Sequence, residues 1–470
     1  MRLNNQNILN DFKSFLNSII NDAEFRLISF AFRIEIKDIF SVVDTFNEIS
    51  EDIFFFSTPH NKQTTIALNS AFEMTSNRTK IFQEAFESFD SIRKKIFNNW
   101  DQINRKSHSI ICCTAKFDAM KSLPEWKDFQ ALRIYIPEFL ISSEADSVLG
   151  YFNFILDNGK NPNDILETLS SYLKIFQNDE NYSDKVSINN VTVNYPNDVD
   201  ELKRWNRMTS EALKELRKGS VSKLVISRSY KFSHDTSIIW NKFLNELYNR
   251  FTDCYLFLIK KNKSFFFGSS PEMFLRISGD IAEVESVAGS APRGTKSEFD
   301  IEFENLLRTS EKNHQEHLIV SNFISEILIN YSENVRIIEE KQIRKLDNIQ
   351  HLITRISAEL ISKDKLFNLI DSLFPTPAVC GVPKENAMQL IRRFESHDRG
   401  LYSGLIGTID FMGNCEIAVS IRSALVQENK VTAFAGAGLV PNSDPEEEFN
   451  ETDLKLNTIL SLFSYENKCK

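Results

Sequence analysis

Apolar and polar positions alternate along much of this chain with the two-residue period of β-strands, interrupted by stretches that have the longer period of helices. Residues 25–36 and 131–141 are rich in β-branched and aromatic side chains and predict strands. Residues 85–100 and 205–220 repeat apolar positions every three or four residues and predict helices, the second closed by Gly219. Both kinds of element are therefore expected from the first part of the chain onward.

The second half of the chain continues this mixture. A strand over 223–232 follows the helix, and the segments 254–268 and 273–289 each predict a hairpin of two strands. A long helical region over 298–329 comes next, and further strand pairs run to residue 435. Long antiparallel strands with helices predict an α+β fold, in which two large, mainly antiparallel β-sheets pack face to face with helices outside.

A polar stretch over 178–201 is the best candidate for an internal boundary. We therefore expect an N-terminal α/β portion over 1–195 and a second portion of the same fold over 200–465. The first portion carries no chemical motif, whereas the second carries all the candidate site residues. The functional site is expected in the second portion.

Composition narrows the class of protein. A formal charge of −10 and a pI near 5.4 argue against nucleic acid as the main partner. No apolar run approaches the roughly 18 residues that a membrane span needs, and Met1–Ile20 does not resemble a signal peptide. The six cysteines show no C-x-x-C spacing, which favours buried reduced thiols over disulfides or zinc. A cytoplasmic protein without a membrane partner is expected.

The segment near the C-terminus predicts a capped helix with an acidic face. Asp444 can accept hydrogen bonds as the N-cap, and Pro445 fits the first helical position. Beyond the cap, Glu448, Glu451 and Lys455 recur at i, i+3 and i+7 and share one face. The two carboxylates can hold a hard cation, and the lysine suggests an anion nearby. A solvated acidic helix start is the alternative interpretation.

Glycine usage also points to the second half. Of 14 glycines, 11 lie between Gly268 and Gly438. A chain so poor in glycine is expected to keep it where a positive φ or a close backbone approach is needed. Clusters such as G-S-S-P-E (268–272) and A-G-A-G (435–438) are therefore predicted to be turns around a ligand.

Four further residues suggest chemistry. Lys223 opens an apolar strand, and a lysine drawn into such surroundings can act as a general base, although most strand-end lysines are solvated. Glu272 follows Ser-Pro at a tight turn, where a carboxylic acid can be held in place. Glu316 precedes an apolar run, so it needs a partner or a metal. Arg422 projects from an apolar strand and suits a ligand carboxylate.

Taken in order, these segments resemble the chorismate-utilising enzymes, a family that includes isochorismate, salicylate, anthranilate and aminodeoxychorismate synthases. The resemblance covers roughly residues 200–460. It is carried by KLVISR (223–228), GSSPEMFLR (268–276), ESVAGSAPRG (285–294), EKNHQEHLIV (311–320), HLITRISAEL (351–360), FPTPAVCGVP (374–383), ESHDRGLYSGLIG (395–407), IAVSIRSA (417–424) and AGAGLVPNSDPEEEFNET (435–452). The N-terminal part is less similar, with ICCTAKF in place of the glycine-rich strand often found there.

The resemblance implies a fold, a reaction and a site. The reaction is the magnesium-dependent conversion of chorismate to isochorismate, with Lys223 as the base that activates water and Glu272 as the acid. Magnesium would be held by Glu316, Glu448 and Glu451. Substrate-binding residues would be Ala288, Gly289, Ser290, Ala378, Tyr402, Arg422, Gly436, Ala437, Gly438 and Lys455.

Two departures keep alternatives open. Phe374 stands where isochorismate synthases often have histidine, which leaves room for a salicylate-forming or other lyase-type member. Asn313 stands where an aspartate is usual, which removes a charge near the metal helix. An aminating member would need a glutamine amidotransferase, whose nucleophile motif this chain lacks. A non-enzymatic homologue with a degenerate site is the remaining alternative. The pathway, menaquinone or siderophore biosynthesis, and the choice between monomer and homodimer stay open.

Overall fold

Two large β-sheets form the centre of the protein in the computed structural model, which describes residues 5–19, 26–60, 62–76, 96–103, 111–144, 147–156, 161–176, 193–194, 200–234 and 237–463. The first sheet has 13 strands in the order β10-β11-β22-β21-β13-β12-β2-β3-β8-β9-β1-β5, with β18 also paired to β11. The second has nine strands in the order β16-β17-β15-β14-β20-β19-β6-β7-β4. Among the described pairs, β1 with β5 is parallel and the others are antiparallel.

The strands of the 13-stranded sheet are β1 (Arg26–Ile34), β2 (Asp52–Ser57), β3 (Thr64–Leu68), β5 (Ile96–Asn98), β8 (Phe139–Glu144), β9 (Ser147–Leu156), β10 (Val193–Asn194), β11 (Lys223–His234), β12 (Tyr255–Lys261), β13 (Ser264–Ser270), β18 (Gly381–Val382), β21 (Ser423–Gln427) and β22 (Lys430–Leu439). Those of the nine-stranded sheet are β4 (Phe72–Ser76), β6 (Ile111–Ala115), β7 (Leu132–Ile136), β14 (Met273–Ser278), β15 (Ile281–Pro292), β16 (Ser332–Lys345), β17 (Ile349–Leu360), β19 (Leu405–Ile409) and β20 (Cys415–Val419).

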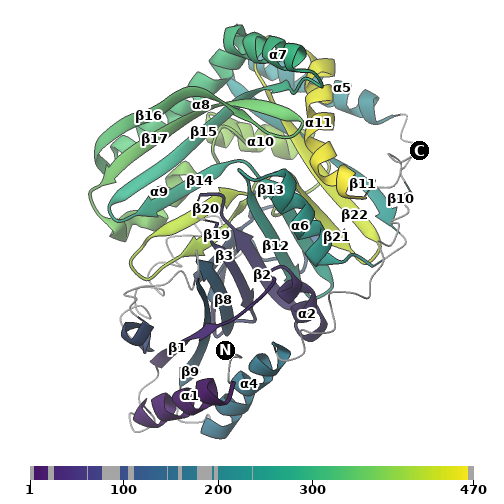
Figure 1. Ribbon diagram of the computed structural model, residues 1–470. Coiled ribbons are helices and arrows are strands. Elements are labelled where there is room, and N and C mark those ends of the chain that lie inside the picture. Colours follow the sequence, from purple (N-terminus) through teal and green to yellow (C-terminus); the bar gives the residue numbers. More distant parts are fainter. Residues whose placement is uncertain are drawn as a thin grey trace.

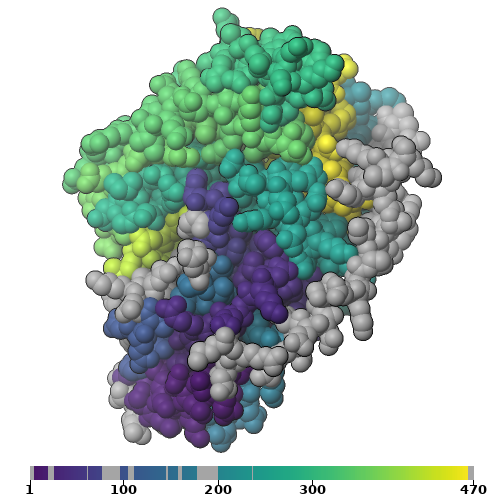
Figure 2. Space-filling model, viewed as in Figure 1, coloured from purple at the N-terminus to yellow at the C-terminus, as the bar shows by residue number. Residues whose placement is uncertain are grey.

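The α-helices among the described residues are α1 (Asn5–Ile19), α2 (Ser41–Ile49), α4 (Pro162–Ile175), α5 (Glu201–Arg217), α6 (Trp240–Arg250), α7 (Ser297–Thr309), α8 (Glu311–Ile329), α9 (Leu366–Leu373), α10 (Lys384–Phe394) and α11 (Pro445–Phe463). In Figure 1, α1 and α4 lie at the N-terminal end of the molecule and α7 lies at the opposite end. The space-filling view in Figure 2 shows the same division, with the N-terminal residues at one end and the residues of α7, α8, β16 and β17 at the other. No helix among the described residues is long and apolar enough to cross a membrane.

Alternating side chains of the large sheet fill two separate cores. Along β12, Phe257 and Ile259 belong to a cluster that also contains residues of the nine-stranded sheet, whereas Leu256 and Leu258 belong to a second cluster with residues of the covering helices. Since side chains alternate between the faces of a strand, one face of this sheet packs on the other sheet and the opposite face packs on helices. The expected α+β sandwich is confirmed.

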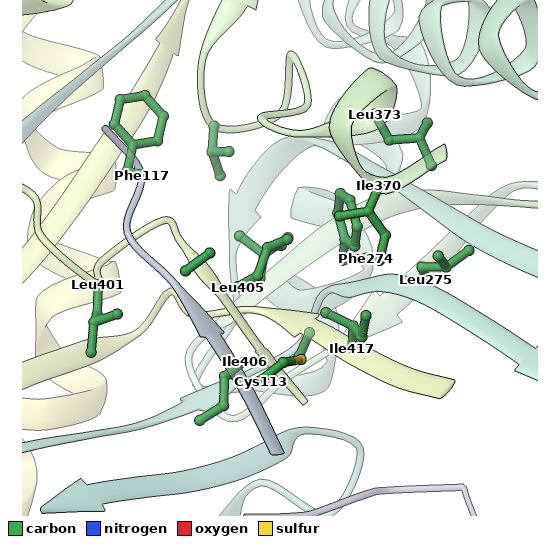
Figure 3. Packing of buried hydrophobic residues seen from close by; sticks show 14 of the residues in the cluster. Cys113, Phe117, Phe274, Leu275, Ile370, Leu373, Leu401, Leu405, Ile406 and Ile417 are labelled. Carbon is green, nitrogen blue, oxygen red and sulfur yellow. The ribbon is translucent and has the colours of Figure 1, made fainter. Parts of the chain in front are cut away.

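Figure 3 shows part of the core around the nine-stranded sheet. Cys113 of β6, Leu405 of β19 and Ile417 of β20 come from neighbouring strands, and Ile370 and Leu373 of α9 lie near Phe274 of β14. The five cysteines among the described residues are all free and buried, as expected.

Several predicted elements need correction. Residues 131–141 form two strands, because β7 ends at Ile136 and β8 begins at Phe139 in the other sheet. Pro137 lies between them, and a proline cannot donate the hydrogen bond that a continuous central strand requires. The helix predicted over 85–100 lies mostly outside the described residues, but Ile96–Asn98 is a strand and not a helix. The helical region over 298–329 is two helices, because Ser310 is extended and caps α8 by accepting a hydrogen bond from the Asn313 amide.

Both sheets combine strands from each side of the expected boundary near residues 195–200. The N-terminal strands β2 and β3 continue the sheet that contains β11, and β6 and β7 continue the sheet that contains β14. The division into 1–195 and 200–465 stays a prediction.

Candidate active site

A narrow cavity of about 60 Å³ lies where strands of the two sheets approach each other. Most of the residues predicted from the sequence to bind substrate or metal line it, namely Glu272, Ala288, Gly289, Ser290, Glu316, Ala378, Tyr402, Arg422, Gly436, Gly438, Glu451 and Lys455. Lys223, Ala437 and Glu448 are buried but do not line it. A larger cavity of about 590 Å³ between α5, β11 and α10 contains none of these residues. The predicted site residues therefore surround the smaller cavity, and side chains there must move to admit a ring-sized ligand.

Glu272 and Arg422 lie at two adjacent crossovers between the sheets. Glu272 lies in the link from β13 to β14, and Arg422 lies in the link from β20 to β21. The Val419 amide donates to the Glu272 carbonyl at 3.2 Å, and the Ser269 amide donates to the Arg422 carbonyl at 3.1 Å. Arg422 has a φ of 51°, which is uncommon for a residue other than glycine. The two crossovers therefore hold each other through backbone hydrogen bonds.

Glu272 is buried and suited to hold a proton at neutral pH. Its side chain is almost completely shielded from solvent, and burial raises its pKa to about 8. Lys223 opposes this shift, and the negative charge of Glu285 adds to it. A carboxyl group that stays protonated near pH 7 in a cavity can act as a general acid.

Lys223 lies directly behind the cavity wall. It is fully buried, and its Nζ lies 3.1 Å from Glu316 Oε1. The angles of this contact lie outside hydrogen-bond geometry, so among the described residues the buried Nζ has an ion-pair partner but no hydrogen-bond acceptor. A Cβ on Gly438 would lie 2.1 Å from Glu316 Oε1 and 3.1 Å from Lys223 Cε. Glycine at 438 is therefore required for these two side chains to meet.

Each of the three glutamates predicted as metal ligands forms an ion pair with a lysine. Glu316 pairs with Lys223, Glu448 of α11 accepts a hydrogen bond from Lys312 of α8, and Glu451 accepts one from Lys455 at 2.5 Å. Each carboxylate is thus neutralised by a different ammonium group. Lys455 also donates to the carbonyl of Gly436 at 2.8 Å.

The two carboxylates on α11 respond differently to their surroundings. Burial, with Glu451 nearby, raises the pKa of Glu448 to about 7. Burial also acts on Glu451, but Lys455 holds the pKa of that carboxyl below its usual range. Within the described part of the chain, no three acidic, histidine or cysteine side chains form a group that could hold a metal ion as they stand. The acidic face of α11 is nevertheless not a solvated helix start, since Glu448 is only 1% exposed.

Arg422 is fixed by a histidine that sequence reasoning did not select. Its Nη2 donates to His351 Nε2 at 2.9 Å, and the His351 Nδ1 lies 3.0 Å from Ser290 Oγ. Burial and the adjacent guanidinium hold the pKa of His351 well below its ordinary value, so the ring is neutral and Nδ1 carries the proton. Arg422 therefore has donors left for an anion in the cavity.

The wall near Tyr402 is aromatic. Its ring stacks on Phe434 with a centroid distance of 5.3 Å, and burial raises the pKa of the phenol to about 12. A Cβ on Gly436 would lie 3.1 Å from the Tyr402 oxygen. Tyr402 therefore presents a neutral hydroxyl group at the cavity over a wide pH range.

The segment A-G-A-G (435–438) is a strand and not the predicted turn. It belongs to β22 and pairs with β11, where Gly436 is opposite Ser227 and Gly438 is opposite Val225. Gly268 likewise lies within β13. Glycine occurs in β22 because the side chains of Glu316 and Tyr402 approach its backbone closely. The chain instead turns after β22, where Asp444 caps α11 as predicted by accepting from the amides of residues 446 and 447.

Sequence reasoning missed Lys312, His351 and the pair Glu285–Arg344, which contacts the backbone around Glu272. Lys312 lies four residues before Glu316 on one helix, a spacing that places both on the same face and could have signalled its role. His351 and Arg344 lie on strands whose polar residues give no such signal in the sequence.

Comparison with known proteins assigns the chain to a family. The model of the family described as "Chorismate binding enzyme" matches residues 14–464. The isochorismate synthase MenF of Bacillus subtilis is 27% identical over 422 residues, which cover 88% of each chain. Component 1 of anthranilate synthase from Saccharolobus solfataricus is 33% identical over 259 residues, which cover 54% of this chain and 61% of that protein.

A solved structure shares the fold. The menaquinone-specific isochorismate synthase MenF from Escherichia coli superposes with a TM-score of 0.75 and 21% sequence identity, covering 97% of this chain and 98% of that one. The family match spans both sheets and every residue of the cavity. This chain belongs to the family of chorismate-binding enzymes.

Proposed function

We propose that the protein is an isochorismate synthase, an isomerase that converts chorismate to isochorismate. The observation that carries this proposal is the similarity to a Bacillus subtilis isochorismate synthase along 88% of both chains. The anthranilate synthase component matches over a shorter part, which covers 54% of this chain. The segment 374–383, whose Ala378 lines the cavity, also resembles isochorismate synthases in sequence.

The reaction exchanges a hydroxyl group between two ring carbons. In our proposal Lys223, in its neutral amine form, takes a proton from the water that attacks ring carbon 2, the ring double bonds shift, and the hydroxyl at carbon 4 departs as water with a proton from Glu272. The burial of Glu272 and its pKa of about 8 support the role of acid. The burial of Lys223 behind Glu316 supports a base that is shielded from bulk water.

The substrate is a dicarboxylate, so the site must supply positive charge. Arg422 and Tyr402 would bind the enolpyruvyl carboxylate, since both line the cavity and Arg422 has free donors beyond His351. The Gly436 carbonyl accepts a hydrogen bond from Lys455, so the backbone groups of Gly436 face away from β11. The Gly436 amide can therefore donate a hydrogen bond to the substrate carboxylate. Ala288, Gly289 and Ser290 would face the leaving hydroxyl.

Magnesium fits the donor chemistry of Glu316, Glu448 and Glu451. Carboxylate oxygens are the ligands that this ion prefers, and each of the three carboxylates is paired with a lysine that supplies compensating positive charge. When bound there, a magnesium ion would neutralise the ring carboxylate of the substrate. The side chains of Lys223, Lys312 and Lys455 would then be free to turn toward other partners.

The remaining expectations belong to the same proposal. The enzyme would work in the cytoplasm as a monomer or homodimer, without an amidotransferase subunit, and would supply either menaquinone or siderophore biosynthesis. Residues 200–465 would form the catalytic portion, completed by residues 1–195 as part of the same two sheets.

Product analysis tests the proposal. Purified protein is incubated with chorismate and magnesium, without ammonia, and the early products are separated by chromatography. Isochorismate as the main product is the expected result. Salicylate and pyruvate as the main early products would instead assign the protein to the lyase branch, and the absence of any product would favour the degenerate homologue.

A further inference from the structure

The link that carries Glu272 is held on both sides by one ion pair. Arg344 of β16 donates a hydrogen bond to the carbonyl of Pro271, immediately before Glu272. Glu285 of β15 accepts a hydrogen bond from the amide of Met273, immediately after it, at 3.4 Å. The two residues flanking Glu272 are thus bound by two side chains that also bind each other.

The ion pair itself has a fixed geometry. Arg344 donates through Nη1 and Nη2 to the two oxygens of Glu285 at 2.8 and 2.7 Å, and Arg355 of β17 adds a third contact at 3.0 Å. Glu285 is 2% exposed. A buried bidentate pair between guanidinium and carboxylate fixes both planes, so its two outer contacts are fixed as well.

This support is needed because the sheet opens at this point. Strand β14 pairs with β15 only from Arg276 to Ser278, and β15 continues alongside β17 instead. Figure 1 shows β14, β15, β16 and β17 in the same layer. At Met273 the ladder between β14 and β15 has ended, and the Glu285 side chain makes the connection that backbone hydrogen bonds no longer make.

We propose that Glu285 and Arg344 are a positioning pair, which fixes the backbone on both sides of Glu272 and so holds its carboxyl group in the cavity. The inference rests on the proposed role of Glu272 as the acid. Neither residue lines the substrate cavity, so both act through Glu272.

The pair also affects the protonation of Glu272. Burial is the largest influence on the pKa of Glu272 and raises it. The negative charge of Glu285 raises the pKa of Glu272 further, whereas the positive charge of Arg344 lowers it. The other charged or titratable groups that act on Glu272 or share its cavity come from α8, α11, β11, β17, the α10–β19 link and the β20–β21 link, namely Glu316, Glu451, Lys455, Lys223, His351, Tyr402 and Arg422. Removal of the Glu285 charge should lower the pKa of Glu272, and removal of the Arg344 charge should raise it.

The test measures the protonation of Glu272 directly. The variants Glu285→Gln and Arg344→Met are compared with wild type by isotope-edited infrared titration, using the carboxylic C=O band that Glu272→Gln removes. The midpoint should move to lower pH in Glu285→Gln and to higher pH in Arg344→Met. Turnover should fall by about 10²-fold in each, as expected for a displaced catalytic group, with a smaller change in KM.

A conservative variant separates position from charge. Arg344→Lys keeps the positive charge but loses the bidentate geometry. Its midpoint should stay near that of wild type while its turnover remains low. This variant also keeps the test usable if Arg344→Met does not fold, which thermal unfolding would reveal.

A matched control lies in the N-terminal part. Asp52 is buried and, like Glu285, contacts two cations, Arg133 through two hydrogen bonds and Lys261 at 2.8 Å. Asp52→Asn should destabilise the protein but leave the Glu272 midpoint unchanged. Wild-type turnover in Arg344→Lys, or in both Glu285→Gln and Arg344→Met, would overturn the proposal, whatever the midpoints do. Failure of the proposed function would appear separately, as wild-type protein that forms no isochorismate while its infrared titration still reports on Glu272.

Discussion

Lys312 of α8 and Glu448 of α11 form a partly buried ion pair that joins the two helices beside the predicted metal ligands. The two residues are 136 positions apart in sequence. Glu448 is almost completely shielded from solvent, whereas the Lys312 side chain keeps 26% of its exposure. The Lys312 ammonium can therefore turn toward solvent while the Glu448 carboxylate stays in place. This arrangement suits the proposed replacement of the ammonium by a divalent ion.

Replacement of Glu448 by glutamine should raise the magnesium concentration needed for half-maximal activity. Loss of one charged ligand should cost at least about tenfold in apparent affinity, the lower end of what even outer-shell partners of metals contribute. Glu447→Gln, on the exposed side of the same helical turn, is the control and should leave the requirement unchanged. Equal saturation curves for Glu448→Gln and wild type would remove Glu448 from the metal site.

Replacement of Lys312 by methionine should have the opposite effect. Without the competing ammonium, Glu448 is available to the cation, and half-maximal activity should need less magnesium. The measurement is the same titration, accompanied by thermal unfolding at saturating magnesium. An increased magnesium requirement would mean that Lys312 supports the site rather than competing for it.

The variants Lys223→Ala and Glu272→Gln should each lower turnover by at least about 10²-fold, the usual contribution of a positioned proton-transfer group. Chorismate affinity should change far less, since we assign carboxylate binding to Arg422, Tyr402 and the metal. Isothermal titration of the inactive variants with chorismate measures this difference. If Lys223→Ala abolishes binding but keeps turnover at saturating substrate, Lys223 is a substrate ligand and the base lies elsewhere.

Turnover should decline as the pH rises through about 8. As the proposed acid, Glu272 must be protonated to act, and its pKa of about 8 means that the protonated form predominates below this pH and is lost above it. The pH profile of kcat at saturating chorismate and magnesium measures this limb. A profile that stays flat from pH 7 to well above 8 would contradict the assignment of Glu272.

The substitution Gly438→Ala should reduce activity strongly and stability weakly. The added Cβ would lie 2.1 Å from Glu316 Oε1, so the side chain that moves is Glu316, a flexible residue of the site, rather than backbone. We expect loss of turnover with an unfolding temperature close to that of wild type, measured by circular dichroism. A large loss of stability would show that the strand and not the site depends on this glycine.

Elements with local signals were predictable from the sequence. The Asp444–Pro445 cap and the helical spacing of Glu448 and Glu451 depend on residues a few positions apart, so the helix and its acidic face were predicted correctly. Long-range contacts were not predictable: the spacing of Lys312 and Glu316 places Lys312 on the face of the site, but it does not show that Glu448, 136 residues away, is its partner.

Glycine was the main source of error. Glycine occurs both in turns and in strands whose backbone a side chain approaches closely, and only the fold distinguishes the two cases. Gly436 and Gly438 were expected in a turn, but the side chains that they accommodate, Tyr402 and Glu316, come from distant parts of the chain. The sequence identified the three carboxylates as candidate metal ligands, but it did not show that each of them pairs with a lysine.

The two crossovers have a mechanical consequence for the whole protein. Glu272 and Arg422 lie on links that pass from one sheet to the other, so a sliding of the sheets would move the proposed acid and the proposed carboxylate-binding arginine out of alignment together. The described N-terminal strands carry none of the residues that we propose as catalytic, but they extend both sheets, and we expect this larger paired area to oppose such sliding. In this proposal the N-terminal part of the chain keeps the reacting groups aligned without taking part in the reaction.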